Sequence, residues 1–450
     1  MPAPSLDPQT APRGTTGGAD AAGPRLLLVT DERFWRRAEG SHARIAALCR
    51  YLADQVGELL VLFVGHLAAA DLAALQHLDP RLRIISRGLG PYRNSMAYRV
   101  RERLRAAVPR AVKRTLSAAL RTWRADPSAT RPTADQAGGE RHLRDFVKPD
   151  FVDLFRQVVA AYRPTLVIVE YVRLSYLMAA PRQRRGDAVR VIDTHDVQSD
   201  RQQSFNTHGE PHYLAITPAE EAAALGHFDV VLAIQPRDAA RLSQLVPGRP
   251  VLTVGHAYPI ERLPPAPQPE CQLVFIGGPG RANRYALDAF LPGVWAPLRA
   301  RFGEQVRLLL FGTLCEQLAG LDLPAGVMPM GRVADVRDAY RHATLVVNPV
   351  AFGGGLKIKT VEALCHGLAL VTTPAGAAGL EDGAGSAFLV CDSAPAMVAA
   401  LGDLIASSAR REALARQALA YALTHFGEAA AYGALAPLLR AHGSPPATTR

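Results

Sequence analysis

The chain has 450 residues, of which 48% are hydrophobic and 20% are charged. This is the composition of a globular protein with enough apolar material for two domains, and it excludes a mostly disordered, collagen-like or coiled-coil chain. The five cysteines are scattered and include no C-x-x-C pair, so neither a disulfide framework nor a cysteine zinc site is expected. A reducing cytoplasm is therefore the expected location.

Residues 1–24 are rich in Pro, Gly, Ala and Thr and contain no apolar run. This predicts a disordered leader rather than a signal peptide or a membrane anchor. No stretch reaches the roughly 18 consecutive apolar residues that a membrane span requires. The tail over residues 441–450 has a similar composition, and we expect it to be disordered too.

Two series of apolar, β-branched runs alternate with amphipathic helical segments, which is typical of parallel α/β sheets. The first series predicts strands at residues 25–30, 59–64, 82–85, 165–170, 189–193, 229–234 and 251–254. A helix is expected over residues 41–54, directly after the first strand. The second series predicts strands at residues 272–276, 307–311, 344–348, 368–372 and 387–391.

The segment between the two series, residues 258–270, contains five prolines, which predicts a stiff linker and a domain boundary. We therefore expect two Rossmann-like domains, residues 25–257 and 271–440, that face each other across a cleft. The last helix of the second domain can pack back on the first. In such an α/β protein the ligand binds in the cleft, at the carboxyl ends of the strands.

The net charge of +10 comes from one region. Residues 81–150 contain 17 Arg and Lys and only 6 Asp and Glu, so the rest of the chain is about neutral. Residues 92–148 are expected to be an insertion in the first domain, with a basic amphipathic helix over residues 97–125. Such a helix favours an anionic membrane surface. The alternative is a helix packed on the first domain with a solvated face, and no nucleic-acid motif is visible.

The strongest chemical signal is the segment NPVAFGGGLKIKTVEALCHGLAL, residues 348–370. Three consecutive glycines, residues 353–355, lie between a predicted strand and a helix expected to begin near Lys357. Converging backbone N–H groups and the positive end of the helix dipole favour an anion such as a diphosphate. Lys357 and Lys359 are two of only four lysines in the chain, and they add positive charge beside the glycines.

Glu362 follows Lys359 by three residues on the same predicted helix. Its carboxylate can accept two hydroxyl hydrogen bonds, which suits the diol of a ribose. The simpler interpretation is a strand-to-helix turn with solvated lysines, and the glutamate and paired lysines argue against it. The segment is not a P-loop, because G-x-x-x-x-G-K-[ST] is absent. No G-x-G-x-x-G follows the first strand, so a nicotinamide dehydrogenase is not expected.

The segment resembles the C-terminal domain of the group 1 glycosyltransferases, which are family 4 enzymes with the GT-B fold. Their pattern is G-x-G-x-K-x-K, then V-x-E-A-[LM]-x-x-G, then T-x-x-G, and it matches residues 353–359, 361–367 and 373–376. The resemblance also covers residues 272–287 and a G-x-V-x-D loop at residues 331–335. In all, it extends over roughly residues 270–395.

The resemblance implies transfer of a sugar, with retention at the anomeric carbon, from a UDP- or GDP-linked donor and without a metal or another cofactor. The second domain would hold the nucleotide sugar, and the first would hold a glycan or lipid-linked acceptor. Such an enzyme would help to build a bacterial surface polysaccharide or glycolipid at the inner face of the cell membrane. A sugar-nucleotide 2-epimerase, which uses a similar two-domain fold, is an alternative.

The resemblance and the loop chemistry together indicate which residues contact the donor. Glu362 would hold the ribose, and Lys357 and Lys359 would stabilise the departing diphosphate. Arg281, like Arg201, is a candidate diphosphate cation, with an ordinary surface arginine as the alternative for each. The remaining donor contacts are expected from Gly277, Gly278, Asn283, Arg332, Val333, Gly353, Gly354, Gly355 and Leu356.

His195 lies in the sequence Asp193-Thr194-His195-Asp196, at the end of a predicted strand. Many members of the family have a histidine there that lines the reaction centre, so the resemblance implies a catalytic position. Asp193 or Asp196 would then orient its ring. A structural histidine is the alternative interpretation.

One position departs from the family pattern. Many members have a glutamate eight residues before the one that matches Glu362, and Gly354 stands there in this chain. In the family that glutamate often contacts sugar hydroxyls. A catalytically inert scaffold that binds a nucleotide sugar is therefore a further alternative.

Overall fold

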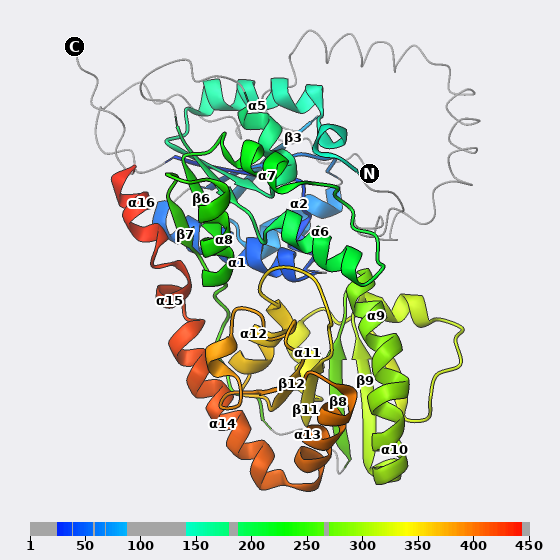
Figure 1. Ribbon diagram of the computed structural model, residues 1–450. Coiled ribbons are helices and arrows are strands. Elements are labelled where there is room, and N and C mark those ends of the chain that lie inside the picture. The colour runs from blue at the N-terminus through cyan, green and yellow to red at the C-terminus, as the bar shows by residue number, and fades with distance from the viewer. Residues whose placement is uncertain are drawn as a thin grey trace, which may run out of the picture.

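The computed structural model describes residues 25–37, 39–56, 59–67, 69–87, 141–179, 188–264 and 270–442. The predicted leader, the predicted basic helix at residues 97–125 and nearly all of the predicted tail lie outside the described residues. The strands form two parallel sheets, and the two domains built on them lie one above the other in Figure 1.

The first sheet has seven parallel strands in the order β3-β2-β1-β4-β5-β6-β7. Every residue of β1, β2 and β4 is buried, as expected for a parallel sheet with helices on both faces. The bounds are β1 (Leu26–Thr30), β2 (Leu59–Phe63), β3 (Leu82–Ser86), β4 (Leu166–Glu170), β5 (Val189–Asp193), β6 (Val230–Ala233) and β7 (Val251–Thr253). All seven predicted strands are present, and no end differs from its predicted bound by more than one residue.

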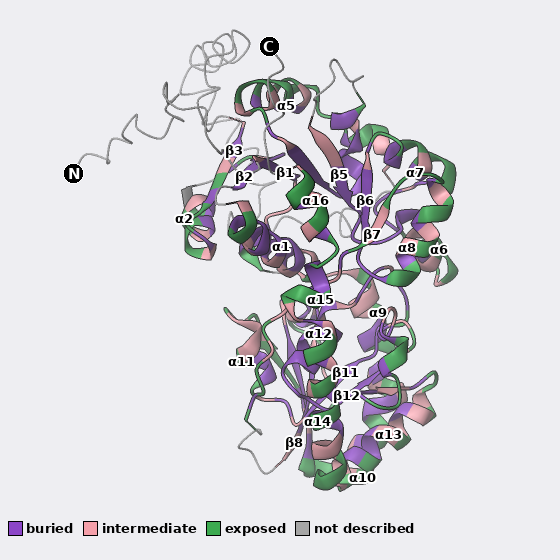
Figure 2. Cartoon of the chain, turned by 90° about the vertical axis from the view of Figure 1, so that its left-hand side faces the viewer, coloured by how far each residue is buried: buried purple, intermediate pink, exposed green. Residues whose placement is uncertain are grey.

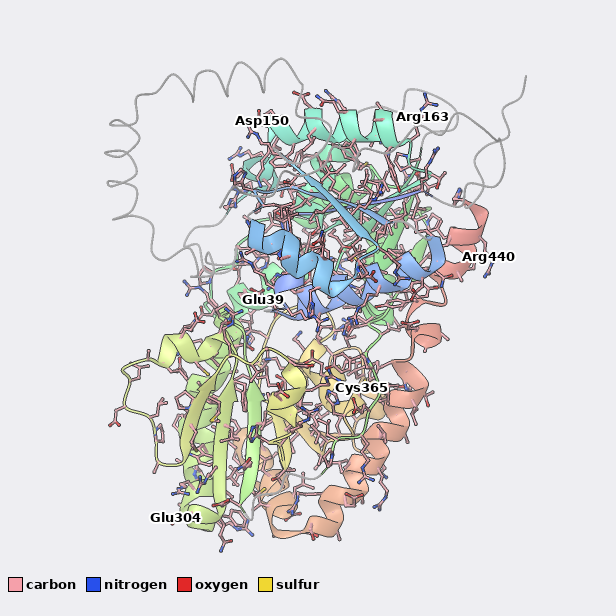
Figure 3. All side chains as sticks on the ribbon, turned by 180° about the vertical axis from the view of Figure 1, so that it is seen from behind. Glu39, Asp150, Arg163, Glu304, Cys365 and Arg440 are labelled. Atoms are coloured by element: carbon pink, nitrogen blue, oxygen red, sulfur yellow. The ribbon has the colours of Figure 1, made fainter. Side chains whose placement is uncertain are left out.

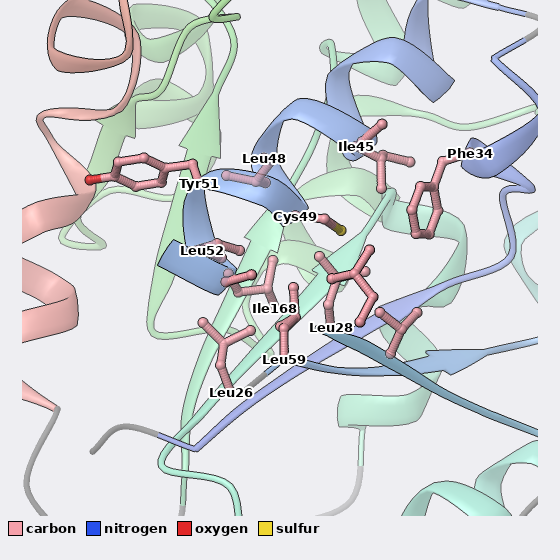
Figure 4. Close-up of a cluster of buried hydrophobic side chains, with 14 of the residues drawn as sticks. Leu26, Leu28, Phe34, Ile45, Leu48, Cys49, Tyr51, Leu52, Leu59 and Ile168 are labelled. Atoms are coloured by element: carbon pink, nitrogen blue, oxygen red, sulfur yellow. The ribbon is translucent and has the colours of Figure 1, made fainter. Parts of the chain in front are cut away.

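Helix α1 (Gly40–Val56) covers one face of this sheet, because apolar residues recur along it at helical spacing. Ile45, Leu48, Cys49 and Leu52 pack in one cluster with Leu26 and other strand residues (Figure 4). The other helical elements are η2 (Phe34–Arg36), α2 (Ala69–Leu78), η4 (Leu143–Phe146), α5 (Pro149–Tyr162), η5 (Val172–Met178), α6 (Gln198–Thr207), α7 (Pro218–Leu225) and α8 (Pro236–Leu245).

The second sheet has six parallel strands in the order β10-β9-β8-β11-β12-β13. Five of them were predicted, and β10 was not. This edge strand has the sequence VMPMG, in which Pro329 argues against a strand, and its Met328 and Met330 are exposed. The bounds are β8 (Cys271–Ile276), β9 (Val306–Phe311), β10 (Val327–Gly331), β11 (Leu345–Asn348), β12 (Leu370–Thr372) and β13 (Leu389–Val390).

In Figure 2 the strands of both sheets are largely buried, whereas the helices around them expose their outer faces. The helical elements of the second domain up to the end of β13 are α9 (Arg281–Phe290), η6 (Leu291–Trp295), α10 (Ala296–Phe302), η7 (Gly303–Gln305), η8 (Thr313–Leu318), α11 (Val336–Tyr340), α12 (Ile358–Cys365) and η9 (Glu381–Gly383). Among the described residues, no helix combines the length and the apolarity that a membrane crossing requires.

The last helices connect the two domains. They are α13 (Ala394–Ala406), α14 (Ser408–His425), α15 (Glu428–Tyr432) and α16 (Leu435–Ala441), and Figure 1 shows α14 to α16 running beside both domains. The Tyr432 ring lies 4.8 Å from that of Tyr51 on α1. Tyr432, Leu435 and Leu439 all belong to a core cluster of the first domain. The C-terminal segment therefore packs back on the first domain.

The order of strands reverses between β1 and β4 in the first sheet and between β8 and β11 in the second. At such a switch point the connections leave in opposite directions and open a crevice at the carboxyl ends of the strands. The predicted site segments follow β5, β8 and β11, which places them at these ends.

Candidate active site

A cleft of about 700 Å³ lies between the two domains, and both contribute to its walls. Glu39, one of its lining residues, is labelled at the junction of the domains in Figure 3. Most of the predicted site residues line this cleft. They are His195, Gly277, Gly278, Asn283, Arg332, Val333, Gly353, Gly354, Gly355, Leu356, Lys357, Lys359 and Glu362.

Residues 349–357, which we call the glycine loop, connect β11 to α12. Gly353 and Gly355 have φ angles of 114° and 64°, a region that glycine adopts without steric cost. A Cβ atom on Gly355 would also lie 2.6 Å from the carbonyl oxygen of His195 in the other domain. Position 355 therefore requires glycine both for its backbone conformation and for the close approach of the two domains.

Gly354 faces the start of α6 in the first domain. A Cβ atom there would lie 3.0 Å from the Asp196 carboxylate and 3.1 Å from Cβ of Arg201. The backbone N–H of Gly353 also donates to the Ser204 hydroxyl on α6, at 3.1 Å. A glutamate at position 354 would push these surfaces apart, which gives a physical reason for the departure from the family pattern.

The two lysines occupy different positions in the cleft. The Lys357 ammonium donates to the carbonyl oxygens of Gly354 and Gly355, at 2.8 and 3.0 Å, and braces the loop. The Lys359 ammonium donates to the Asn283 side chain at 2.6 Å and lies over the Phe275 ring. Burial, with help from Arg201, lowers the pKa of Lys357 to about 8. Burial, with help from Lys357, lowers the pKa of Lys359 to about 7.

Glu362 lies on α12 and is buried at the edge of the cleft. The Tyr340 hydroxyl donates to its carboxylate at 3.1 Å. Burial raises the pKa of Glu362 to about 7, against the opposing effects of Tyr340 and Lys359. One carboxylate oxygen is therefore held by the protein, and the group can still accept a hydroxyl from a ligand.

The two candidate arginines lie in different places. Arg201 lines the cleft, with its guanidinium 3.5 Å from the Asp196 carboxylate. Arg281 does not line the cleft, because it is exposed and pairs with Glu210 at 3.2 Å. A donor contact by Arg281 stays a prediction that the cleft lining does not support.

His195 reaches the cleft from the first domain, at the end of β5. Its Nε2 atom lies 2.5 Å from Oε2 of Glu170, the last residue of the neighbouring strand β4. The ring stacks on Tyr171, with centroids 3.9 Å apart and planes 6° from parallel. Both His195 and Tyr171 have positive φ angles, 62° and 69°. Such backbone strain in non-glycine residues is concentrated at functional sites.

The expectation that Asp193 or Asp196 orients the His195 ring is wrong. Asp193 is held instead by Arg44, whose guanidinium donates to both carboxylate oxygens at 2.9 and 3.0 Å. The Asp196 carboxylate accepts from the Gln198 amide. Within His195, the Asp193 carboxylate contacts the backbone N–H, at 3.4 Å, and not the ring. The side chain that orients the ring is Glu170.

Glu170, Asp193 and His195 offer ligand atoms within 4.8 Å of one another, a spacing that a metal ion could also use. Arg44 already supplies a positive charge to this group, because both it and Asp193 are buried and directly paired. A divalent cation would have to displace that ion pair or share its space. The donor set therefore fits an ion-pair network better than a metal centre.

Sequence reasoning missed Glu170, Tyr171 and Arg44. A usable signal was present, because the predicted strand at residues 165–170 ends in a glutamate after a run of apolar residues. The register pairs Glu170 with Asp193 across β4 and β5. Two acidic residues that end adjacent buried strands must share one edge of the sheet, but the strand order was needed to see this.

The comparisons with known proteins concern the family and the fold. Residues 270–407 match the family model described as glycosyl transferases group 1. No curated protein matches the sequence of the chain. Many solved structures are similar to it.

Three of these structures cover nearly the whole chain. Sucrose-phosphate synthase from Thermosynechococcus elongatus has a TM-score of 0.62 at 14% identity, over 93% of this chain and 98% of that one. HepE from Anabaena, in complex with UDP and glucose, has a TM-score of 0.60 at 13% identity, over 93% and 99%. A TarM mutant from S. aureus, in complex with fondaparinux, α-GlcNAc-glycerol and UDP, has a TM-score of 0.63 at 10% identity, over 92% and 99%.

At these identities the likeness shows the fold, and the predicted two-domain GT-B architecture is confirmed. The family match covers the segment that contains the glycine loop, Lys359 and Glu362. Residues 270–407 thus match a group 1 glycosyltransferase domain within a GT-B fold, and this domain indicates a glycosyltransferase.

Proposed function

We propose that this glycosyltransferase moves a sugar from a UDP- or GDP-linked donor to a glycan or lipid-linked acceptor, with retention at the anomeric carbon. The observation that carries the proposal is a single cleft to which the two domains contribute different functional groups. The second domain contributes the glycine loop, Lys359 and Glu362, and the first contributes His195. HepE and TarM, which share the fold, were solved with UDP.

The second domain supplies the donor half of the site. Glu362 accepts hydroxyl hydrogen bonds from the ribose, and the glycine loop offers backbone N–H groups to the diphosphate. Arg332 and Val333, which follow β10 and line the cleft, would contact the base. Lys357 and Lys359 oppose the negative charge that grows on the leaving diphosphate.

The reaction breaks the bond between the anomeric carbon and the diphosphate oxygen and forms a bond from the same carbon to an acceptor hydroxyl oxygen. A leaving phosphate oxygen takes the proton of that hydroxyl, so no protein nucleophile is required. Attack and departure on the same face account for retention. The charge that develops on the diphosphate is met by the lysines and the loop N–H groups, and the proposal assigns no metal.

The acceptor would bind against the first domain, near His195, Tyr171 and Tyr213, which all line the cleft. Aromatic faces beside hydrogen-bonding groups suit a sugar ring, because they offer apolar contact and polar anchors together. We place the enzyme at the inner face of the cell membrane, with residues 97–125 on the anionic surface, where it would contribute to surface polysaccharide or glycolipid synthesis.

The direct test is a reaction panel in which UDP- and GDP-linked sugars are incubated with the protein, with and without glycan acceptors. Nuclear magnetic resonance of the product would then report the anomeric configuration. We expect release of one nucleoside diphosphate and a product with the configuration of the donor. An inverted product would contradict the retaining mechanism. An isomerised donor without acceptor would indicate an epimerase, and donor binding without turnover would indicate an inert scaffold.

A further inference from the structure

Glu170 is a fully buried acidic residue beside the cleft. Its side chain has no exposed surface. One carboxylate oxygen, Oε1, is buried and has no hydrogen-bond partner among the described residues. The other pairs with Nε2 of His195 at 2.5 Å. Burying a carboxylate oxygen without a hydrogen-bond partner costs free energy of folding. The hydrogen bond to His195 is therefore the interaction that accounts for a carboxylate at this position.

The His195 ring is also fixed on its face. Tyr171 stacks on it at 3.9 Å, and the guanidinium of Arg173 lies 4.0 Å from the centre of the Tyr171 ring. Arg173 is in turn held by Asp31 at 2.8 Å. Glu170 is the last residue of β4, and Tyr171 and Arg173 follow it within three positions. One short segment therefore sets both the plane of the imidazole and the direction of its Nε2 atom.

This arrangement leaves one ring nitrogen for a ligand. Nε2 is used by Glu170, and Nδ1 has no hydrogen-bond partner in the part of the chain that the structure describes. A carboxylate that accepts from Nε2–H holds the neutral ring in the tautomer whose lone pair is on Nδ1. That nitrogen can then accept a hydrogen bond from a hydroxyl group of the sugar in the cleft.

We infer that Glu170 is a positioning residue for His195, and that it fixes the tautomer with which His195 accepts a sugar hydroxyl during transfer. The role of the sugar hydroxyl rests on the proposed function, whereas the tautomer of the His195 ring does not. Glu170 touches no substrate and acts only through the imidazole. Asp193 cannot replace it, because Arg44 occupies both of its carboxylate oxygens.

The kinetic test compares Glu170→Gln with Glu221→Gln. Glu221 is a matched control, because it is equally buried and accepts only from backbone N–H groups at the start of α6, outside the cleft lining. We expect Glu170→Gln to lower kcat roughly 10- to 100-fold, as loss of the partner of a functional histidine commonly does. The donor KM should change less than about twofold, because Glu170 does not line the cleft.

An equal loss of kcat in both variants, or no loss in Glu170→Gln, would overturn the inference. The state of the ring is tested separately by ¹⁵N nuclear magnetic resonance of histidine-labelled protein, with His195→Gln to assign the signal. We expect a single tautomer protonated at Nε2 in the wild type and in Glu221→Gln, and a mixture in Glu170→Gln. The same tautomer distribution in wild type and Glu170→Gln would contradict the inference. If the wild type turns over no donor, the proposed function fails, whereas the resonance result still decides the role of Glu170.

Discussion

Lys359 is one of the two lysines proposed to stabilise the diphosphate, and its contacts show how its ammonium is held in the cleft. Asn283 accepts its hydrogen bond at 2.6 Å, and the ring of Phe275 lies beneath it. We predict that Lys359→Ala lowers turnover about 10²- to 10³-fold, the usual loss for one group that stabilises the charge of a transition state. Lys148→Ala, at an exposed position outside the cleft lining, is the control. Equal turnover in the two variants would remove Lys359 from the site.

The lowered pKa values of Lys357 and Lys359 predict that donor binding is coupled to the uptake of protons. Burial brings the pKa of Lys357 to about 8 and that of Lys359 to about 7. A bound diphosphate favours the charged ammonium and raises both pKa values, so binding takes up protons near pH 8. Affinity should therefore fall as the pH rises through 7 to 9.

Calorimetry at pH 8 in two buffers of different ionisation enthalpy measures this uptake directly. We expect net proton uptake when a nucleoside diphosphate binds, and less of it in Lys359→Ala. Net proton release would contradict the assignment of the lysines to the diphosphate.

At the residue scale, the sequence predicted the donor half of the site better than the other half. Lys357, Lys359 and Glu362 lie within six residues of one another in one segment, so local spacing alone brings them together. The contact between Glu170 and His195 joins two residues 25 positions apart, one at the end of β4 and the other just after β5. Only the order and register of the strands place those two residues side by side.

At the scale of elements, the glycine loop is shaped by its contact with the first domain. We predict that Gly355→Ala lowers turnover, because it adds both an unfavourable backbone conformation and a clash with the His195 carbonyl group. Gly385→Ala is a matched control, since Gly385 has a φ of 78° and an added Cβ would meet nothing within 4 Å. Each variant should lose about 1 kcal/mol of stability from the backbone conformation, measurable by thermal unfolding.

Only Gly355→Ala should also lose turnover beyond what its stability explains. If both variants retain wild-type turnover at a temperature where they are folded, the close approach of the two domains at position 355 is not needed for the reaction.

The strands themselves were predictable because most are buried on both faces and appear as continuous apolar runs. β10 is the exception: it lies at the edge of its sheet, and its residues 328–330 are exposed. Pro329 removes a backbone N–H from the strand and argues against one, and the other edge strands, β3, β7 and β13, contain no proline. The cleft still depends on β10, because Arg332 and Val333 follow it directly.

For the whole molecule, the concentration of positive charge between residues 81 and 150 supports the proposed membrane location. We predict that the protein sediments with anionic liposomes at low salt and is released at high salt, since the attraction of each basic residue, about 1 kcal/mol at the surface, is screened by ions. Deletion of residues 97–125 should abolish the binding. Unchanged sedimentation after the deletion would contradict this location.

The two-domain arrangement follows from features that the sequence contains in full, namely two α/β series and a proline-rich connection. The way the domains meet does not, because it depends on contacts between segments far apart in the chain. Gly353 meets Ser204, and Tyr432 returns to Tyr51. These contacts bring the donor half of the cleft opposite His195, which neither domain could do alone.

The central claim, a nucleoside diphosphate site built on Glu362 and the glycine loop, is tested most directly by thermal unfolding with UDP, GDP, ADP and CMP. The panel compares the wild type with Glu362→Ala, and it uses no added metal. A ligand that binds only the folded protein raises its unfolding temperature. We predict stabilisation of the wild type by one diphosphate and loss of that stabilisation in Glu362→Ala. No shift with any nucleotide, or an equal shift in the variant, would contradict the account.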